Sequence, residues 1–310
     1  MNYLLILVGF GILILGGSWL LKAAVSLSLR LDIPKIIIGM TVVSFATSAP
    51  ELIVSLKSAL EGHPDIALGN VIGSNIANLG FVLGIVIVVG TIQVKRSFYL
   101  TDWPVMMLAS GMLYLFLAFD GELQRWEGFV LFVTLLLVLI YLLKFQKIAV
   151  IDEMPHDDVQ YTMGKSLLFL LLGGVSLWGG SELLIEGAVN LAEHFGVSKR
   201  VIGVTVISVG TSIPELAASL VAISRKEKAI SLGNLLGSNV FNILAVLGIT
   251  AMISPIKADD QRLMSFDIIW MLAFAFIVFP LVFAPGRMRL SWGEGLILLG
   301  SYLVFLTMVV

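Results

Sequence analysis

Ten long apolar segments follow one another along the chain, and short polar turns separate them. A helix that crosses a membrane needs roughly 20 apolar residues. The apolar runs are continuous and do not alternate with polar residues, as strands of a membrane barrel would. The pattern therefore predicts an all-α membrane protein of ten transmembrane helices, at about 3–29, 36–60, 66–92, 99–118, 127–144, 166–193, 201–224, 229–254, 265–284 and 292–309.

Composition supports lipid as the surroundings of most of this surface. Hydrophobic residues make up 58% of the chain and charged residues only 13%, against about 25% charged residues in a typical soluble domain. There is no cysteine, so disulfides and thiolate metal sites are excluded. The sequence has no basic patch with interleaved aromatics, which argues against nucleic-acid binding. Nothing in it indicates an obligatory protein partner or a bound cofactor.

The longest polar stretch, Lys144–Lys165, lies near the middle of the chain. It predicts a first transmembrane repeat at 1–145, a linker at 146–164 and a second repeat at 165–310. With the N-terminus outside, the inner loops hold about twelve lysines and arginines and the outer loops about six. The positive-inside rule then predicts both termini outside an inner (cytoplasmic) membrane and a cytoplasmic linker.

An internal repeat organises the chain. Gly39–Leu56 aligns with Gly203–Leu220 at an offset of 164 residues, with about eleven of eighteen positions identical. Gly69–Asn78 aligns with Gly233–Asn242 at the same offset. Each half contains five predicted spans, and an odd number makes the second half enter the membrane from the opposite side. The sequence therefore predicts two inverted five-helix repeats, an arrangement used by many secondary transporters.

The first repeated block places one acid in the middle of a span. Its hydroxyls and its carboxylate are spaced to share one helical face. The proline beside the carboxylate has no N–H and deprives a preceding carbonyl of its helical partner. In the first half these residues are Ser44, Thr47, Ser48, Glu51 and Pro50, with the freed carbonyl at Ala46; in the second half they are Ser208, Thr211, Ser212, Glu215 and Pro214, with the freed carbonyl at Gly210.

The second block adds further oxygen atoms. Its serine and last asparagine are four residues apart and share a face, its glycines are predicted to allow close helix packing, and the asparagine directly after the serine is predicted either to bond across helix contacts or to bind an ion. The residues are Ser74, Asn78, Gly69, Gly73 and Asn75, and Ser238, Asn242, Gly233, Gly237 and Asn239. The summed oxygen-rich site contains no thiol and no imidazole, which favours calcium, sodium or protons.

Together, these paired blocks resemble the two α-repeats of the calcium/cation antiporter superfamily, in particular the prokaryotic sodium/calcium exchangers and YrbG-type inner-membrane proteins. The resemblance covers essentially the whole chain. It implies four clustered ion sites and three sodium ions exchanged per calcium ion, with the first and sixth helices sliding as a gate. It implies calcium at Glu51 and Glu215 with Asn78 and Asn242 in the middle, and flanking sodium sites at Thr47, Ser48, Thr211, Ser212, Ser74 and Ser238, with the carbonyls of Ser44 and Ser208.

One position departs from the family pattern, because some sodium/calcium exchangers carry an aspartate where this chain has Asn242. With one carboxylate fewer, a proton that titrates Glu51 or Glu215 can replace sodium as the counter-ion. The leading prediction is a calcium/sodium antiporter, with a calcium/proton antiporter of the same fold as the alternative. A passive channel is disfavoured by the inverted broken helices. An intramembrane hydrolase would need a serine–histidine pair or two facing aspartates at depth, so we expect no enzyme.

Overall fold

The computed structural model describes residues 2–144, 160–195, 208–258, 260, 262–283 and 288–309. These residues are overwhelmingly helical, which confirms the predicted all-α class. Several helices run on from one another through a short wider π-helical segment, labelled η. The first half contains α1 (Asn2–Leu31), α2 (Lys35–Ile38), η1 (Gly39–Val43), α3 (Ser44–Thr47), α4 (Ala49–Leu60), α5 (Pro64–Ala77), η2 (Asn78–Val82), α6 (Leu83–Val89), η3 (Phe98–Asp102), α7 (Trp103–Asp120) and α8 (Arg125–Lys144).

The second half repeats this order after the linker. Most of the predicted linker, 145–159, lies outside the described residues, as does 196–207. The described elements are α9 (Met163–His194), α11 (Ser208–Gly210), α12 (Ile213–Ser224), α13 (Lys228–Phe241), η7 (Asn242–Leu247), α14 (Gly248–Ile253), η8 (Leu263–Asp267), α15 (Ile268–Phe283) and α16 (Trp292–Val309).

Within the described residues, eight continuous helices are long and apolar enough to cross a membrane. A ninth candidate is the pair Lys35–Thr47 and Ala49–Leu60, which is bent by 44°. These nine fall on nine of the ten predicted spans. The tenth, at 201–224, is described only from Ser208, so ten spans remain a prediction. The protein is a multi-pass membrane protein.

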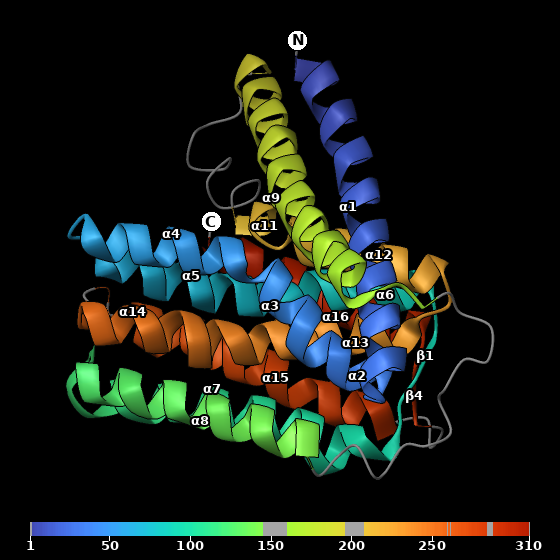
Figure 1. Cartoon of the computed structure of the whole chain (residues 1–310). Helices are drawn as coiled ribbons and strands as arrows, with labels where there is room; N and C mark the ends of the chain where they lie inside the picture. Colours follow the sequence, from blue (N-terminus) through green and yellow to red (C-terminus); the bar gives the residue numbers. More distant parts are fainter. Residues whose placement is uncertain are drawn as a thin grey trace.

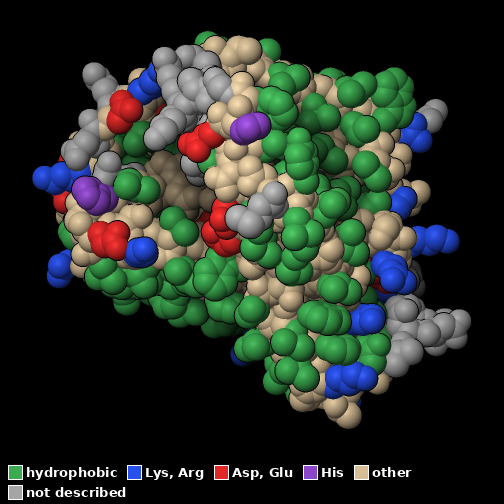
Figure 2. Space-filling model, turned by 90° about the horizontal axis from the view of Figure 1, so that it is seen from above, with side chains coloured by type: hydrophobic (Ala, Val, Ile, Leu, Met, Phe, Trp, Pro, Cys, Tyr) green, Lys and Arg blue, Asp and Glu red, His purple; other side chains and the backbone are tan. Residues whose placement is uncertain are grey.

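Two spans form the centre of the bundle. In the most apolar stretches of Ile66–Val89 and Lys228–Ile253, 78% and 83% of the residues are buried, against 22–39% in the other continuous spans. The remaining helices therefore cover this pair and turn apolar side chains outward. Figure 2 shows the resulting surface, a broad expanse of hydrophobic side chains with lysines and arginines along the right-hand edge and a mixture of acidic, basic and histidine side chains at the left.

Helices α1 and α9 lie side by side and cross the main bundle steeply (Figure 1). Glycines allow their close approach: a Cβ at Gly173 would lie 2.8 Å from the Leu20 nitrogen, and one at Gly180 would lie 3.0 Å from the Gly9 oxygen. Backbones can pack this closely only where side chains are absent, as in many membrane helix pairs. The two helices thus form one unit laid across the bundle.

Two short antiparallel ribbons tie the halves together, and the sequence pattern did not predict them. Each ribbon pairs one strand from each half. The first joins β1 (Ile92–Gln93) to β4 (Arg289–Leu290), and the second joins β2 (Glu122–Leu123) to β3 (Ile256–Lys257). Because the strands are exchanged in the same way at both places, the two halves make equivalent contacts.

Candidate functional site: a buried oxygen cluster at two helix breaks

The helix of each first block breaks two residues before its proline. In the first half α3 ends at Thr47, Ser48 leaves the helical conformation with φ −87° and ψ 2°, and α4 begins at Ala49. Pro50 then occupies the second position of α4, where its missing N–H leaves no hydrogen bond unmade. Glu51 follows in the first turn, where the partial positive charge of the helix N-terminus favours a carboxylate.

The second half has the same local structure. Ser212 adopts φ −91° and ψ 4°, α12 begins at Ile213, and Pro214 and Glu215 follow in its first turn. The repeat predicted from the sequence is therefore present in the backbone angles at this position. Each break carries one acid into the interior at the start of a new helix.

Both acids are fully buried, with 1% of Glu51 and 0% of Glu215 exposed. The two carboxylates are near enough to interact electrostatically. Thr47, Ser48 and Ser238 lie beside the Glu215 carboxylate, but no oxygen of either acid has a hydrogen-bond partner. The structure thus brings together two acids from opposite halves of the chain, and their charge is not satisfied by the protein.

Further buried oxygens around the breaks also lack partners. They are the hydroxyls of Ser48 and Ser212, the side-chain amide of Asn78 and the Oδ1 atom of Asn242. The Ser-x-x-Glu spacing at each break is that of a capping box, in which the two side chains would bond to backbone N–H groups. Neither serine side chain makes a cap hydrogen bond. Helix capping therefore does not explain why these serine and glutamate oxygens are buried at the breaks.

An unpartnered buried oxygen costs about 1–3 kcal/mol, so a cluster of them needs another explanation. A cation supplies it, since carboxylate, hydroxyl and amide oxygens are the ligands that calcium and sodium prefer. No cluster of three or more His, Cys, Asp or Glu side chains occurs among the residues described here. The oxygen-rich donor set fits a hard cation.

Two hydroxyl pairs join the halves beside the acids. Thr47 Oγ1 lies 3.2 Å from Ser238 Oγ, and Ser74 Oγ lies 3.1 Å from Thr211 Oγ1. The pairs correspond to each other at the offset of 164 residues. The predicted hydroxyls of the first block thus meet the predicted serines of the second block, each time across the boundary between halves.

Ser44 lies one turn before the first break. Its hydroxyl donates to the carbonyls of Gly39 and Asn234, at 2.8 and 2.9 Å, which joins η1 and α13. Its carbonyl accepts the Ser48 N–H at 2.8 Å. The side chain of Ser208 lies outside the described residues.

The carbonyls of the residues four positions before the prolines both lie against α9. The Gly210 carbonyl accepts a hydrogen bond of 3.0 Å from the Ser181 hydroxyl. A Cβ at Gly174 would lie 3.7 Å from the Ala46 carbonyl oxygen. Helix α9 therefore passes both helix breaks.

The glycines of the second block behave differently in the two halves. A Cβ at Gly233 or Gly237 would collide with the backbone of Ile36 or Met40, which agrees with the predicted packing role. At Gly69 and Gly73 no described atom lies within 4 Å of the Cβ position. These two glycines instead line a cavity of about 180 Å³.

Of the two asparagines that directly follow the serines of the second block, Asn75 bonds to a neighbouring helix and Asn239 bonds within its own helix. Asn75 Nδ2 donates to the Asn239 carbonyl at 3.3 Å, and Asn75 Oδ1 accepts from Asn242 Nδ2 at 3.1 Å. Asn239 donates to the Leu235 carbonyl at 2.7 Å. Because the Asn242 amide nitrogen is held by Asn75, the Asn242 oxygen is left free to face the cluster.

Sequence reasoning missed Asn70 and Asn234. Asn70 donates to Ser55 and Asn234 donates to Ser219, both at 3.2 Å. Asn234 also accepts from Thr47 at 3.1 Å. The signal was present, because both asparagines follow the first glycine of the repeated second block. They fix the helices of the two blocks against each other.

Comparison with known proteins identifies the family. The family model for the sodium/calcium exchanger protein matches residues 1–144 and 165–310. The chain belongs to the sodium/calcium exchanger family. The family consists of membrane transporters, so cation antiport is the class of activity to which this member belongs.

Relatives match over nearly their whole length. The chain is 36% identical to the putative antiporter CaxA of Alkalimonas amylolytica over 96% of this chain and 95% of that protein. It is 33% identical to the inner membrane protein YrbG of Escherichia coli K12, over 98% and 95%. The fold matches the sodium/calcium exchanger structure from Methanococcus jannaschii with a TM-score of 0.81 at 24% identity, covering 99% of this chain and 97% of that one.

Proposed function

We propose that this family member is a secondary active antiporter that exchanges calcium for sodium across the cytoplasmic membrane by alternating access. The observation that carries the proposal is the pair of buried, unpartnered carboxylates of Glu51 and Glu215. Two ionised carboxylates neutralise one divalent cation. An isolated charge at the bilayer centre costs at least about 2.5–3.5 kcal/mol, so a site that must always be balanced by cations favours exchange over simple release.

We assign calcium to the middle of the cluster and sodium to its flanks. Glu51, Glu215, Asn78 and Asn242 are the calcium ligands in this proposal. The flanking sodium ligands are Thr47, Ser48, Ser74, Thr211, Ser212 and Ser238, with the carbonyls of Ser44 and Ser208. The hydroxyl pairs between Thr47 and Ser238 and between Ser74 and Thr211 support this assignment, since each brings together one oxygen from either half, and the first pair lies beside Glu215.

Ten spans in two inverted repeats, 1–145 and 165–310, are part of the same proposal. Support comes from features that recur at a constant offset. Asn70 and Ser55 make the same hydrogen bond as Asn234 and Ser219, 164 residues later. The strands of the two ribbons also exchange between halves in equivalent ways. Equivalent halves can open in turn to the two sides of a membrane.

The proposed orientation has both termini outside and the 146–164 linker in the cytoplasm. The right-hand edge in Figure 2, where lysines and arginines stand with few acids, supports it, because lysines and arginines are enriched on cytoplasmic surfaces. One relative is named as an inner membrane protein, which agrees with the proposed location.

The counter-ion decides between sodium and protons. One relative, 26% identical over 98% of this chain, is named the sodium/calcium exchanger MaX1 of Methanosarcina acetivorans, which favours sodium. Because Asn242 supplies an amide where a carboxylate would carry charge, proton coupling through Glu51 or Glu215 is the second candidate.

Liposomes containing the purified protein test the choice. We expect ⁴⁵Ca²⁺ uptake when the lumen holds sodium and the bath does not, at equal pH on both sides. Liposomes with equal sodium and an imposed proton gradient are the control. Uptake driven by the proton gradient alone would assign protons, and uptake driven by neither gradient would refute antiport by this protein.

A further inference from the structure

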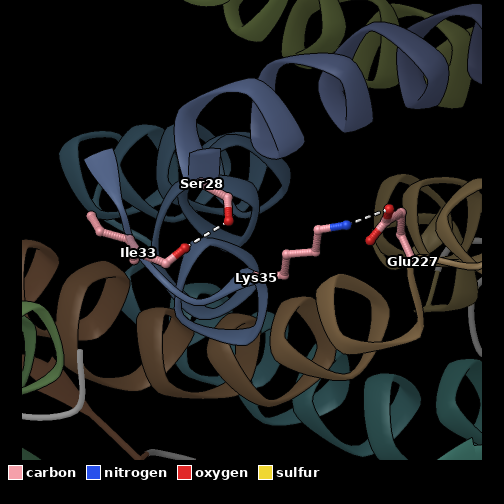
Figure 3. Close-up of polar contacts among 4 residues, drawn as sticks. All are labelled: Ser28, Ile33, Lys35 and Glu227. Carbon is pink, nitrogen blue, oxygen red and sulfur yellow. Dashed lines mark hydrogen bonds and ion pairs between the residues drawn. The ribbon is translucent and has the colours of Figure 1, made fainter. Parts of the chain in front are cut away.

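One buried ion pair joins the two halves at the end of the bundle where α2 begins. Lys35 Nζ lies 2.6 Å from Glu227 Oε1, and only 11% and 15% of the two side chains are exposed (Figure 3). Lys35 is the first residue of α2, and Glu227 directly precedes α13. The proposed cation cluster uses neither residue, so the pair has a role of its own.

The pair lies beside α1, at the cytoplasmic end of that helix in the proposed orientation. Glu227 lines a cavity of about 430 Å³ whose other walls include residues of α1. Near the end of α1, the Ser28 hydroxyl donates to the Ile33 carbonyl at 2.6 Å and fixes the turn that carries Lys35 (Figure 3). Helix α1 and the ion pair are therefore connected through a short, fixed turn.

The contacts between α1 and α9 are equivalent at the offset of 164 residues. A Cβ at Gly9 would lie 2.8 Å from the Gly180 carbonyl oxygen, and one at Gly173 would lie 3.0 Å from the Gly16 carbonyl oxygen. The second contact is the first with both residue numbers transferred to the other half. Each position in α1 therefore has a structural counterpart in α9.

The counterparts differ in how they pack against the rest of the bundle. Ala24 and Leu20 of α1 are fully buried in an apolar cluster with residues of α2, α12 and α13. Their counterparts in α9, Ala188 and Leu184, are only half-buried. Packing around the two helices is therefore tighter on the side of the ion pair, which is the cytoplasmic side in the proposed orientation.

The α4–α5 turn, at the other end of the bundle (Figure 1), has the backbone of the α12–α13 turn without its carboxylate. Gly62 and Lys226 both adopt a left-handed conformation, with φ 86° and 66°. The N–H groups of the next residues, His63 and Glu227, both donate to a carbonyl five residues earlier at 2.8 Å. An exposed histidine thus occupies the position that is equivalent to the glutamate of the ion pair. The counterpart of Lys35 is Lys199, which lies outside the described residues.

We propose that the Lys35–Glu227 pair is a one-sided latch, which holds the cytoplasmic side closed and biases the protein toward the state that opens outward. The inference rests on the proposed alternating access of two inverted repeats. In such a cycle the two halves exchange roles between the two states, so the contacts of Glu227 pass to His63 in the opposite state. Because a histidine supplies no carboxylate, only one of the two states gains this ion pair. A contact that differs between two conformations shifts the equilibrium between them.

Single cysteines can report the two states, since the chain contains no cysteine of its own. Ala24→Cys reports the cytoplasmic side, and Ala188→Cys reports the equivalent position on the outer side. Both are labelled with a membrane-impermeant maleimide, in inside-out and right-side-out vesicles respectively. We expect Ala188→Cys to react faster than Ala24→Cys. Adding Glu227→Gln should raise the rate at Ala24→Cys relative to that at Ala188→Cys about tenfold, which corresponds to about 1.4 kcal/mol.

Two further variants support the measurement. Glu227→Gln takes the carboxylate away from a buried lysine and can impair folding. Lys35→Gln combined with Glu227→Gln removes both charges and should raise the ratio of rates in the same direction. Glu61→Gln breaks the exposed Lys57–Glu61 pair, which spans 3.8 Å, and is the matched control. The opposite order of rates in the starting variants, or a ratio that neither latch variant changes, would overturn the proposal.

His63→Glu tests whether the latch is one-sided. It supplies a carboxylate at the equivalent outer position and should slow the labelling of Ala188→Cys, whereas His63→Gln should not. An unchanged rate in His63→Glu would contradict the one-sided character. ⁴⁵Ca²⁺ exchange in the same vesicles separates the two levels of the argument: if the wild type does not exchange calcium, the proposed function fails, and if it exchanges calcium while all labelling ratios stay equal, only the latch fails.

Discussion

Glu51→Gln separates an ion-binding role of the buried acids from a structural one. Glutamine keeps the shape of the side chain and removes its charge. Both carboxylate oxygens of Glu51 lack partners, and the charge of Glu215 is close by. In ion-free buffer the variant should therefore be more stable than the wild type, since a charge at the bilayer centre costs at least about 2.5–3.5 kcal/mol.

The loss of the Glu51 charge should also weaken calcium binding. With only Glu215 ionised, one positive charge of the bound calcium ion stays uncompensated, at a similar cost of at least about 2.5–3.5 kcal/mol. Every 1.4 kcal/mol is a factor of ten in affinity, so calcium binding should weaken roughly a hundredfold and exchange should be lost.

Thermal unfolding with and without calcium, together with ⁴⁵Ca²⁺ exchange in liposomes, measures both effects. Glu61→Gln removes an exposed carboxylate at the far end of α4 and is the control. The reasoning is refuted if Glu51→Gln destabilises the ion-free protein while calcium still raises its unfolding midpoint as in the wild type. That result would mean that the carboxylate supports the fold and that calcium binds elsewhere.

Three further predictions concern the surroundings of the site. Gly173→Ala should destabilise the α1–α9 contact by about 1–3 kcal/mol, because its new Cβ would meet backbone atoms of α1. Gly179→Ala, whose Cβ would meet no described atom, should not. A comparison of the two unfolding midpoints tests this. Asn75→Leu should weaken calcium binding about tenfold, because it releases Asn242 and the loss of a residue that orients a ligand typically costs a factor of ten or more. Asn75→Asp keeps the acceptor and should restore most of the binding, and equal binding in both variants would contradict this. Asn242→Asp should favour calcium over sodium in competition assays, because a third carboxylate adds ligand charge, and unchanged preference would place this residue outside the site.

The sequence was sufficient to predict the class of fold and to single out the two acids that the structure buries. Apolar length determines where helices can cross lipid, and the signal is strong because exposed backbone is not tolerated there. The duplicated Pro-Glu pairs were informative for a similar reason, since an acid in an apolar helix is rarely there without a partner or a ligand. Glu51 and Glu215 accordingly lie together in the interior.

Details that depend on packing between distant segments were not predictable. The face shared by Ser44 and Glu51 follows from helical spacing, but whether a hydroxyl bonds to a neighbouring helix depends on which helix lies there. The Ser44 hydroxyl bonds to Asn234, 190 residues away. Spacing likewise treated Gly69 and Gly233 as equivalent, and only Gly233 meets a described backbone. The ribbon strands of two residues each are too short for any periodic signal.

The hydroxyl pairs also bear on how a leak could be avoided in the proposed cycle. Thr47 with Ser238 and Ser74 with Thr211 each take one oxygen from either half. A cation held by such a pair loses one of its ligands whenever the halves separate. Opening the site would then be costly unless another cation or water replaced the lost oxygen. The same geometry that binds an ion therefore opposes opening of an incompletely filled site, which is the condition an exchanger must meet and a channel need not.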